Sequence, residues 1–203
     1  MKWTAIFLLC SALTAGESRL FLSKSFPGSS PDYVAITIEQ SGVTEYKEAA
    51  DDDHPLKLQL SASEAAELFA LAEKLDHFKR PLESALKVAK MGVKTFRFEK
   101  GTEKTEVSFN FSEDLDARAM VDWFEKISET GQTYWALDRA VKYDKLGVNQ
   151  ALLQFNIAMD KKKLVSTQLF LPLLDRIAKN DSYMNMARTR AANLAEAIRA
   201  VAK

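Results

Sequence analysis

The hydrophobic pattern of this chain changes to a helical one near residue 113 and stays helical from there on. Before that point, apolar residues alternate with polar ones, as in 33–39 (YVAITIE), where Val34, Ile36 and Ile38 share one face. After it, apolar residues recur at three- and four-residue spacing, which is typical of helices. Strands followed by helices predict an α+β fold. We expect an antiparallel sheet of about five strands with one packed helix, followed by a helical C-terminal half.

The predicted strands lie at 33–39, 43–48 and 56–60, with a hairpin within 93–111. Their connections are short and polar, which favours antiparallel pairing, because parallel strands need long crossovers. Ser61 and Glu64 form a capping box at the start of a helix that should end near Asp76. Residues 17–31 are rich in serine and proline towards their end, and we interpret them as an irregular lead-in.

The helical half contains several apolar stripes, separated by glycines and a proline. One stripe ends near Ile127 and another begins at Tyr134, after Gly131. Pro172 should begin or kink a later helix. The last helix should run from about Asp181, its N-cap, to Val201.

A boundary near 128–132 (SETGQ) divides an α+β domain, residues 17–130, from a helical region, residues 131–203. No long flexible linker separates the halves, so a single compact unit is the alternative.

The first sixteen residues, MKWTAIFLLCSALTAG, predict the compartment. Lys2 is followed by a short apolar run and by small residues suited to cleavage after Ala15 or Gly16. The run is shorter than the roughly 20 residues that a membrane span needs. We interpret residues 1–16 as a secretory signal peptide and expect an exported protein, periplasmic or extracellular, without a membrane span after cleavage.

Cleavage removes Cys10, the one cysteine of the 203 residues. The mature chain then has no disulfide and no thiolate ligand, so its core alone must stabilise it. A domain of this length buries roughly 70% of the surface that its unfolded chain exposes, which is sufficient for a stable core without disulfides.

Charge and motifs exclude several classes of function. The chain has 28 basic and 28 acidic residues, and the two signs are mixed along the sequence. It therefore lacks the excess of basic residues that nucleic-acid binding requires. It contains no nucleophile elbow, no Walker loop and no dinucleotide-binding glycine motif. We therefore assign no catalytic residue and expect no cofactor.

The sharpest polar feature is the run Asp51-Asp52-Asp53-His54. Carboxylate oxygens and an imidazole nitrogen are suitable ligands for Ca²⁺, Mg²⁺ or Zn²⁺. Asp51, Asp53 and His54 are therefore the candidate metal ligands. The alternative is a solvated loop between two strands, because the glycine and the later glutamate of a calcium-binding loop are absent.

Three other features have simpler interpretations. His77 near a helix end is explained by the helix dipole, and Lys161–Lys163 by a solvated helix end. The aromatic residues Trp123, Phe124, Tyr134 and Trp135 either line a groove or, as their helical spacing favours, belong to the core.

The N-terminal half carries a recognisable order of motifs. It begins with 26–33 (FPGSSPDY), continues through a strand pair with Gly42 and Tyr46, and reaches Leu60-Ser61. This order resembles a domain of unknown function found in exported bacterial proteins. That family has a cysteine pair where this chain has Phe26 and Ser30. Over about residues 25–110, the resemblance implies export and an α+β fold, and it implies no catalytic role.

These observations favour a non-catalytic binding or interaction module of the bacterial envelope, with a protein or an envelope component as partner. Two alternatives stay open. One is a carboxylate- or metal-dependent hydrolase that uses the loop from Asp51 to His54. The other is a structural protein that associates with itself through the alanine-faced C-terminal helix. The sequence leaves the oligomeric state undetermined.

Overall fold

The computed structural model describes residues 17–201. The predicted signal peptide, Cys10 and the cleavage site lie outside these residues. The fold is α+β, as the sequence predicted, with one antiparallel sheet of six strands in the order β4-β3-β2-β1-β5-β6. The strands are β1 (Arg19–Ser25), β2 (Tyr33–Glu39), β3 (Val43–Lys47), β4 (Leu56–Gln59), β5 (Val93–Lys100) and β6 (Glu103–Phe109).

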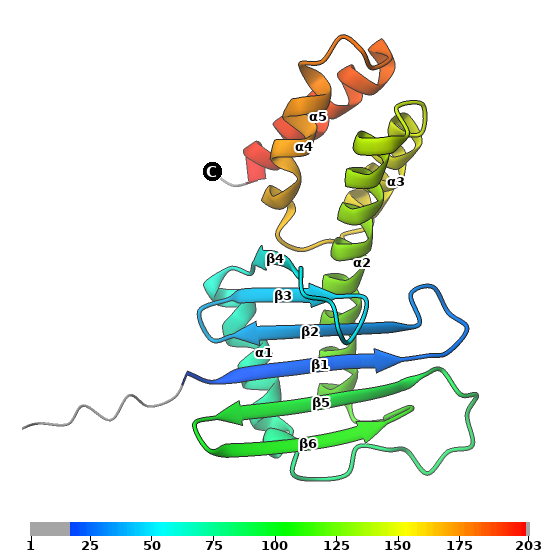
Figure 1. Cartoon of the computed structure of the whole chain (residues 1–203). Helices are drawn as coiled ribbons and strands as arrows, with labels where there is room; N and C mark the ends of the chain where they lie inside the picture. Colours follow the sequence, from blue (N-terminus) through cyan, green and yellow to red (C-terminus); the bar gives the residue numbers. More distant parts are fainter. Residues whose placement is uncertain (1–16, 202–203) are drawn as a thin grey trace, which may run out of the picture.

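Two helices cover one face of the sheet, behind the strands in Figure 1. They are α1 (Ala62–Lys74) and the first half of α2 (Leu115–Tyr143), and a single left-handed turn, η1 (Asp76–Phe78), follows α1. The capping box is confirmed: the Glu64 N–H donates to Ser61 Oγ, and the Ser61 N–H donates to Glu64 Oε2. Leu20, Ile36 and Phe96 are among the buried strand residues in the core below these helices.

The strand β1 corrects the interpretation of residues 17–31 as a lead-in. It lies between β2 and β5 and pairs with both along its whole length. Leu20 and Leu22 point to the covered face, but Lys24 occupies the next position on that face. Since Phe21 joins the two leucines into one continuous apolar run and the residues after it are polar, the alternation is hidden in the sequence.

The helix α2 is continuous across 128–132, where two separate apolar stripes met in the sequence. Gly131 lies within it and does not end it. A Cβ atom at position 131 would lie 2.5 Å from the ring of the buried residue Tyr46. The glycine therefore permits close contact between helix and sheet, and its helix cost of about 1 kcal/mol is offset by that packing.

The second half of α2 packs with α3 (Val148–Asp160), α4 (Leu171–Ala178) and α5 (Asn185–Val201) around a second core, above the sheet in Figure 1. A short 3₁₀ turn, η2 (Thr167–Phe170), precedes α4. Tyr134 and Leu169 pack against both cores. Within residues 17–201, none of the helices is long and apolar enough to cross a membrane.

The helix α4 begins at Leu171 with Pro172 in its first turn, as predicted. The predicted start of the last helix was wrong, because α5 begins at Asn185 and Asp181 is not its N-cap. A turn precedes the helix, in which the buried Tyr183 donates its hydroxyl to the Val141 carbonyl. The Asp181 carboxylate instead lies 2.7 Å from the Arg188 guanidinium.

Candidate functional site

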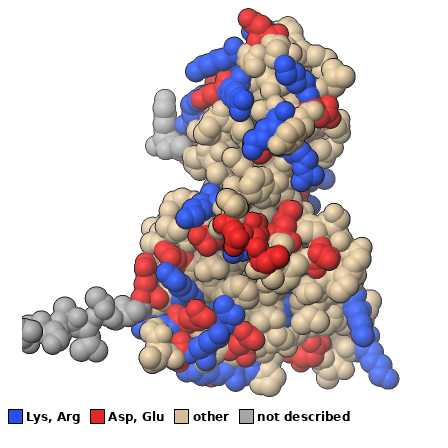
Figure 2. All heavy atoms as spheres, in the orientation of Figure 1, with Lys and Arg blue, Asp and Glu red and all other residues tan. Residues whose placement is uncertain are grey.

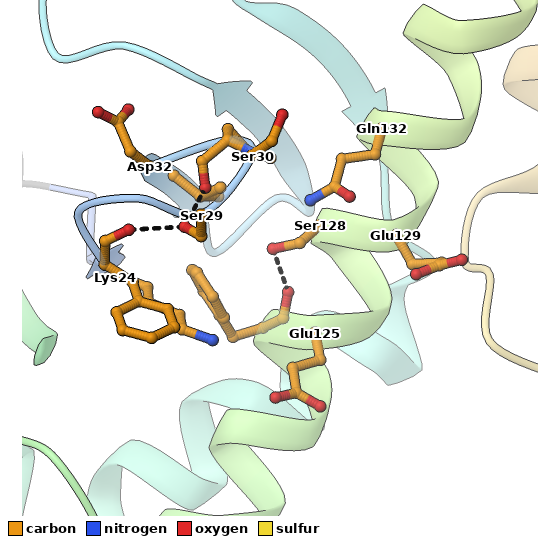
Figure 3. Close-up of a pocket in the computed structure, with 12 residues that line it drawn as sticks. Lys24, Ser29, Ser30, Asp32, Glu125, Ser128, Glu129 and Gln132 are labelled. Carbon is orange, nitrogen blue, oxygen red and sulfur yellow. Dashed lines mark hydrogen bonds between the residues drawn. The ribbon is translucent and has the colours of Figure 1, made fainter. Parts of the chain in front are cut away.

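A pocket of about 260 Å³ lies between α2 and the loop that joins β1 to β2. Figure 3 shows this loop on one side and the middle of α2 on the other. The pocket combines hydroxyl, amide and charged side chains over an apolar floor that includes Phe124. Its lining residues are Lys24, Phe26, Ser29, Ser30, Pro31, Asp32, Val34, Phe124, Glu125, Ser128, Glu129 and Gln132.

The loop wall is held by its own hydrogen bonds. The Phe26 N–H donates to the Asp32 carbonyl (2.8 Å), and the Ser29 N–H donates to the Phe26 carbonyl (3.0 Å). The Ser29 hydroxyl also lies 2.7 Å from the Phe26 carbonyl oxygen and 2.6 Å from that of Pro31. Because these bonds lie within the loop, its shape does not depend on a bound partner.

The helix wall connects the pocket to a buried tyrosine. Figure 3 shows Gln132 directed towards the loop. The Gln132 side chain also acts on the buried Tyr46 hydroxyl, in the direction that lowers its pKa. That hydroxyl donates to Glu48 Oε1 at 2.8 Å. Burial, and next the hydrogen bond with Glu48, raise the pKa of Tyr46 far above its usual range. Tyr46 is therefore a neutral, fixed hydrogen-bonding group behind the pocket.

Charge in the pocket is unequal. Lys24 is the cation among the lining residues, whereas Asp32, Glu125 and Glu129 are carboxylates. Asp32 and Glu125 are exposed, so these carboxylates lie at the rim and give the opening negative charge. The pocket thus offers hydrogen-bond partners inside and negative charge around its opening.

Two of the three serine hydroxyls that line the pocket are engaged with backbone carbonyls. Ser128 Oγ donates to the Phe124 carbonyl at 2.7 Å, and Ser29 faces backbone carbonyls as described. A hydroxyl that donates to a backbone carbonyl does not share its proton with a base, as a nucleophilic serine must. The arrangement is suited to binding a polar group.

The predicted metal ligands lie elsewhere, in the loop between β3 and β4. Asp51, Asp53 and His54 are exposed, and Figure 2 shows acidic atoms gathered over this loop. Asp52 Oδ1 accepts the His54 backbone N–H at 2.8 Å, which is a local turn. In the part of the chain that the structure describes, no three histidine, cysteine or acidic side chains meet in a cluster that could hold a metal ion. Asp51, Asp53 and His54 are therefore not brought together.

His77 lies in the turn η1, directly after α1. Its ring centroid is 4.3 Å from that of Phe98, and its carbonyl accepts a hydrogen bond from the Thr105 hydroxyl. These contacts fasten the turn to the sheet. Nothing in them suggests a general base.

The aromatic residues on α2 belong to the core, as their spacing favoured. Phe124 is buried, and Trp123, Tyr134 and Trp135 are partly buried against the sheet core. The run Lys161–Lys163 is exposed and follows the last residue of α3. The alanine face of α5 is covered within the chain, because Ala187, Ala191 and Ala195 are buried in the helical core.

Sequence reasoning missed the pocket residues Lys24, Ser128 and Gln132. One signal was available at Lys24, because a charged residue stands at the third position of a face begun by Leu20 and Leu22. No comparable signal marked Ser128 or Gln132. No known protein family matches this chain, and no curated protein matches it in sequence.

Proposed function

We propose that this protein is an exported, non-catalytic binding module of the bacterial envelope, and that the pocket between α2 and the 26–32 loop holds its partner. The observation that carries the proposal is the pocket itself. It has an ordered loop wall, polar side chains inside and carboxylates at its rim, and the hydroxyls of Ser29 and Ser128 are engaged with backbone carbonyls. These properties favour recognition over group transfer.

The chemistry of the rim indicates the kind of partner. Three carboxylates face one ammonium group among the lining residues. A partner that inserts a lysine or arginine side chain would complement this charge and use Gln132 and the loop hydroxyls as hydrogen-bond partners. The partner is therefore proposed as a basic segment of an envelope protein.

The test is photo-crosslinking in the cell, with the photoreactive residue placed at Asp32 on the pocket rim. A matched control carries it at Asn193, which is exposed on α5 in the helical half. We expect one recurrent adduct from position 32 and none from position 193. A second pair of samples adds Glu125→Lys with Glu129→Lys, which should reduce the adduct at least tenfold. Equal adducts from both positions, or an adduct that the charge reversal leaves unchanged, would contradict the proposal.

The mass of the crosslinked chain tests export in the same experiment. Loss of the first 15 or 16 residues is expected for a processed, exported protein. An intact N-terminus would contradict cleavage.

A further inference from the structure

Two lysines face each other on the covered side of the sheet. Lys24 of β1 and Lys94 of β5 are register partners in the antiparallel pair, and Lys94 is only 8% exposed. Like charges directly opposite destabilise a sheet, and a buried ammonium group normally has a carboxylate partner. The Lys94 ammonium donates to the Asn110 carbonyl at 2.7 Å. In the described chain, neither lysine makes a salt bridge with a carboxylate.

A second cavity, of about 180 Å³, opens beside this pair. That volume is roughly six times the ~30 Å³ that a water molecule occupies in the liquid. Its apolar walls include Phe109, Phe111 and Val121, and Arg118 adds a third cation to the two lysines. Asp122 and Glu125 also line it, so positive charge is in excess. The cavity shares Lys24 and Glu125 with the pocket proposed for the partner and otherwise has its own lining.

We propose that this cavity binds a small carboxylic acid with an apolar body. The carboxylate lies between the ammonium groups of Lys24 and Lys94, and Arg118 contributes the third positive charge. The apolar body packs on the aromatic rings of Phe109 and Phe111. A ligand of this kind supplies a negative charge to pair with the two lysines. Its apolar body covers cavity walls that water solvates poorly. The inference concerns a site distinct from the proposed partner pocket and does not depend on it.

The ionisation of Lys94 is consistent with this assignment. Burial, and next the charge of Lys24, lower the pKa of Lys94 below its usual range, while Glu125 and Glu83 act in the opposite direction. A bound carboxylate would favour the charged ammonium and raise the pKa again. Binding should therefore take up protons in the range where Lys94 is partly deprotonated in the free protein.

Calorimetric titration of the full chain with pentanoate tests the site, with sodium chloride at the same ionic strength as reference. We expect saturable binding of pentanoate and none of pentylamine, which has the same chain and the opposite charge. Lys94→Met and Lys24→Met should each weaken binding at least tenfold. Lys161→Met removes a lysine that is exposed at the end of α3, and it should leave the affinity unchanged.

A further variant separates loss of the site from loss of the fold. Val121→Trp fills the cavity from the half-buried side of α2 and keeps all three cations, so it should also abolish binding. Each variant is compared with the wild type by circular dichroism. The proposal is overturned if pentanoate does not bind, if pentylamine binds as well, or if folded Lys94→Met and Val121→Trp bind pentanoate like the wild type.

Discussion

The two cores of this protein differ in how much polarity they bury. The helical core, around the second half of α2, consists of apolar residues and Tyr183. Of the eight buried polar or charged residues in the described chain, only Asp138 lies after residue 131. The others, including Lys94, Thr44 and Thr130, lie before residue 131, in the part of the chain that we call the sheet unit. Buried polar groups cost stability unless they are hydrogen-bonded, and proteins often retain them near functional sites. Both proposed sites lie in the sheet unit, which holds most of these groups.

The helical unit, by contrast, has the character of a scaffold. Phe155 and Phe170 are fully buried and stack with ring centroids 4.3 Å apart. The alanines of α5 permit close approach to its neighbours, and the Arg199 guanidinium lies 2.6 Å from the Asp175 carboxylate of α4. Because α2 runs through both units, a change in one core should be felt as lost stability of the chain.

The largest effect should come from truncation in the helical core. Phe155→Ala removes one ring of the buried stack and should lower the free energy of unfolding by about 3–5 kcal/mol. Denaturant unfolding followed by circular dichroism measures it. Leu146→Ala is the control, because Leu146 is 79% exposed and its loss should cost no more than about 0.5 kcal/mol. Equal costs for the two variants would show that the helical core is not a packed scaffold.

The next effect tests a hydrogen bond that fixes the connection between α3 and η2 to the middle of α2. Thr130 is fully buried on α2, and its Oγ1 accepts the Val165 N–H at 3.0 Å. Thr130→Val keeps the shape and leaves this buried N–H without an acceptor, so it should cost about 1–3 kcal/mol. Hydrogen exchange at the Val165 amide should accelerate in parallel. Thr133→Val, at a half-buried position on the same helix, is the control, and an equal effect there would remove the special role of Thr130.

A smaller effect is expected at the contact between α2 and the sheet. Gly131→Ala should gain about 1 kcal/mol of helix propensity, but its Cβ would overlap the Tyr46 ring, and overpacking costs about 1–3 kcal/mol. The net result should be a modest destabilisation, measured by denaturant unfolding. Ala136→Gly on the exposed side of α2 should follow propensity and destabilise by about 1 kcal/mol. A stabilised Gly131→Ala protein would contradict the close packing.

The strands that the sequence predicted share one property, a buried face with regular alternation. This holds for β2 with Val34, Ile36 and Ile38, and local patterns of this kind depend only on neighbouring residues. The strand β1 was not predicted, because Lys24 occupies the position where a third apolar residue would complete the alternating pattern. Gly131 looked like a helix boundary because the reason for it, the Tyr46 ring, lies on a distant strand.

The candidate site could not be predicted from the sequence for a related reason. Its walls come from residues 24–34 and 124–132, which only the tertiary fold brings together. The run Asp51-Asp52-Asp53-His54 suggested a metal site because its potential ligands are adjacent in the chain. Adjacent residues in an exposed turn point in different directions, so adjacency alone does not assemble a ligand set.

The smallest expected effect is in the alkaline pH dependence of stability, where two buried groups of the sheet unit act in opposite senses. The pKa of Tyr46 is raised in the fold, so the unfolded chain loses this proton first. Its stabilising contribution is complete below the ordinary tyrosine pKa of about 10 and is lost as pH rises above it. The pKa of Lys94 is lowered in the fold, so stability rises with pH up to the ordinary lysine value of about 10.4.

Denaturant unfolding of the wild type and two variants between about pH 9 and pH 11 separates these contributions. Tyr46→Phe should flatten the fall in stability above about pH 10, and Lys94→Met should remove the opposing rise and so steepen the fall. Tyr143→Phe makes the same substitution at a residue that is 83% exposed and serves as the control for the loss of a tyrosine hydroxyl. If both variants kept the wild-type slope, these groups would titrate as they do in water. The contrast between a polar sheet unit and an apolar helical scaffold would then have no energetic basis at these positions.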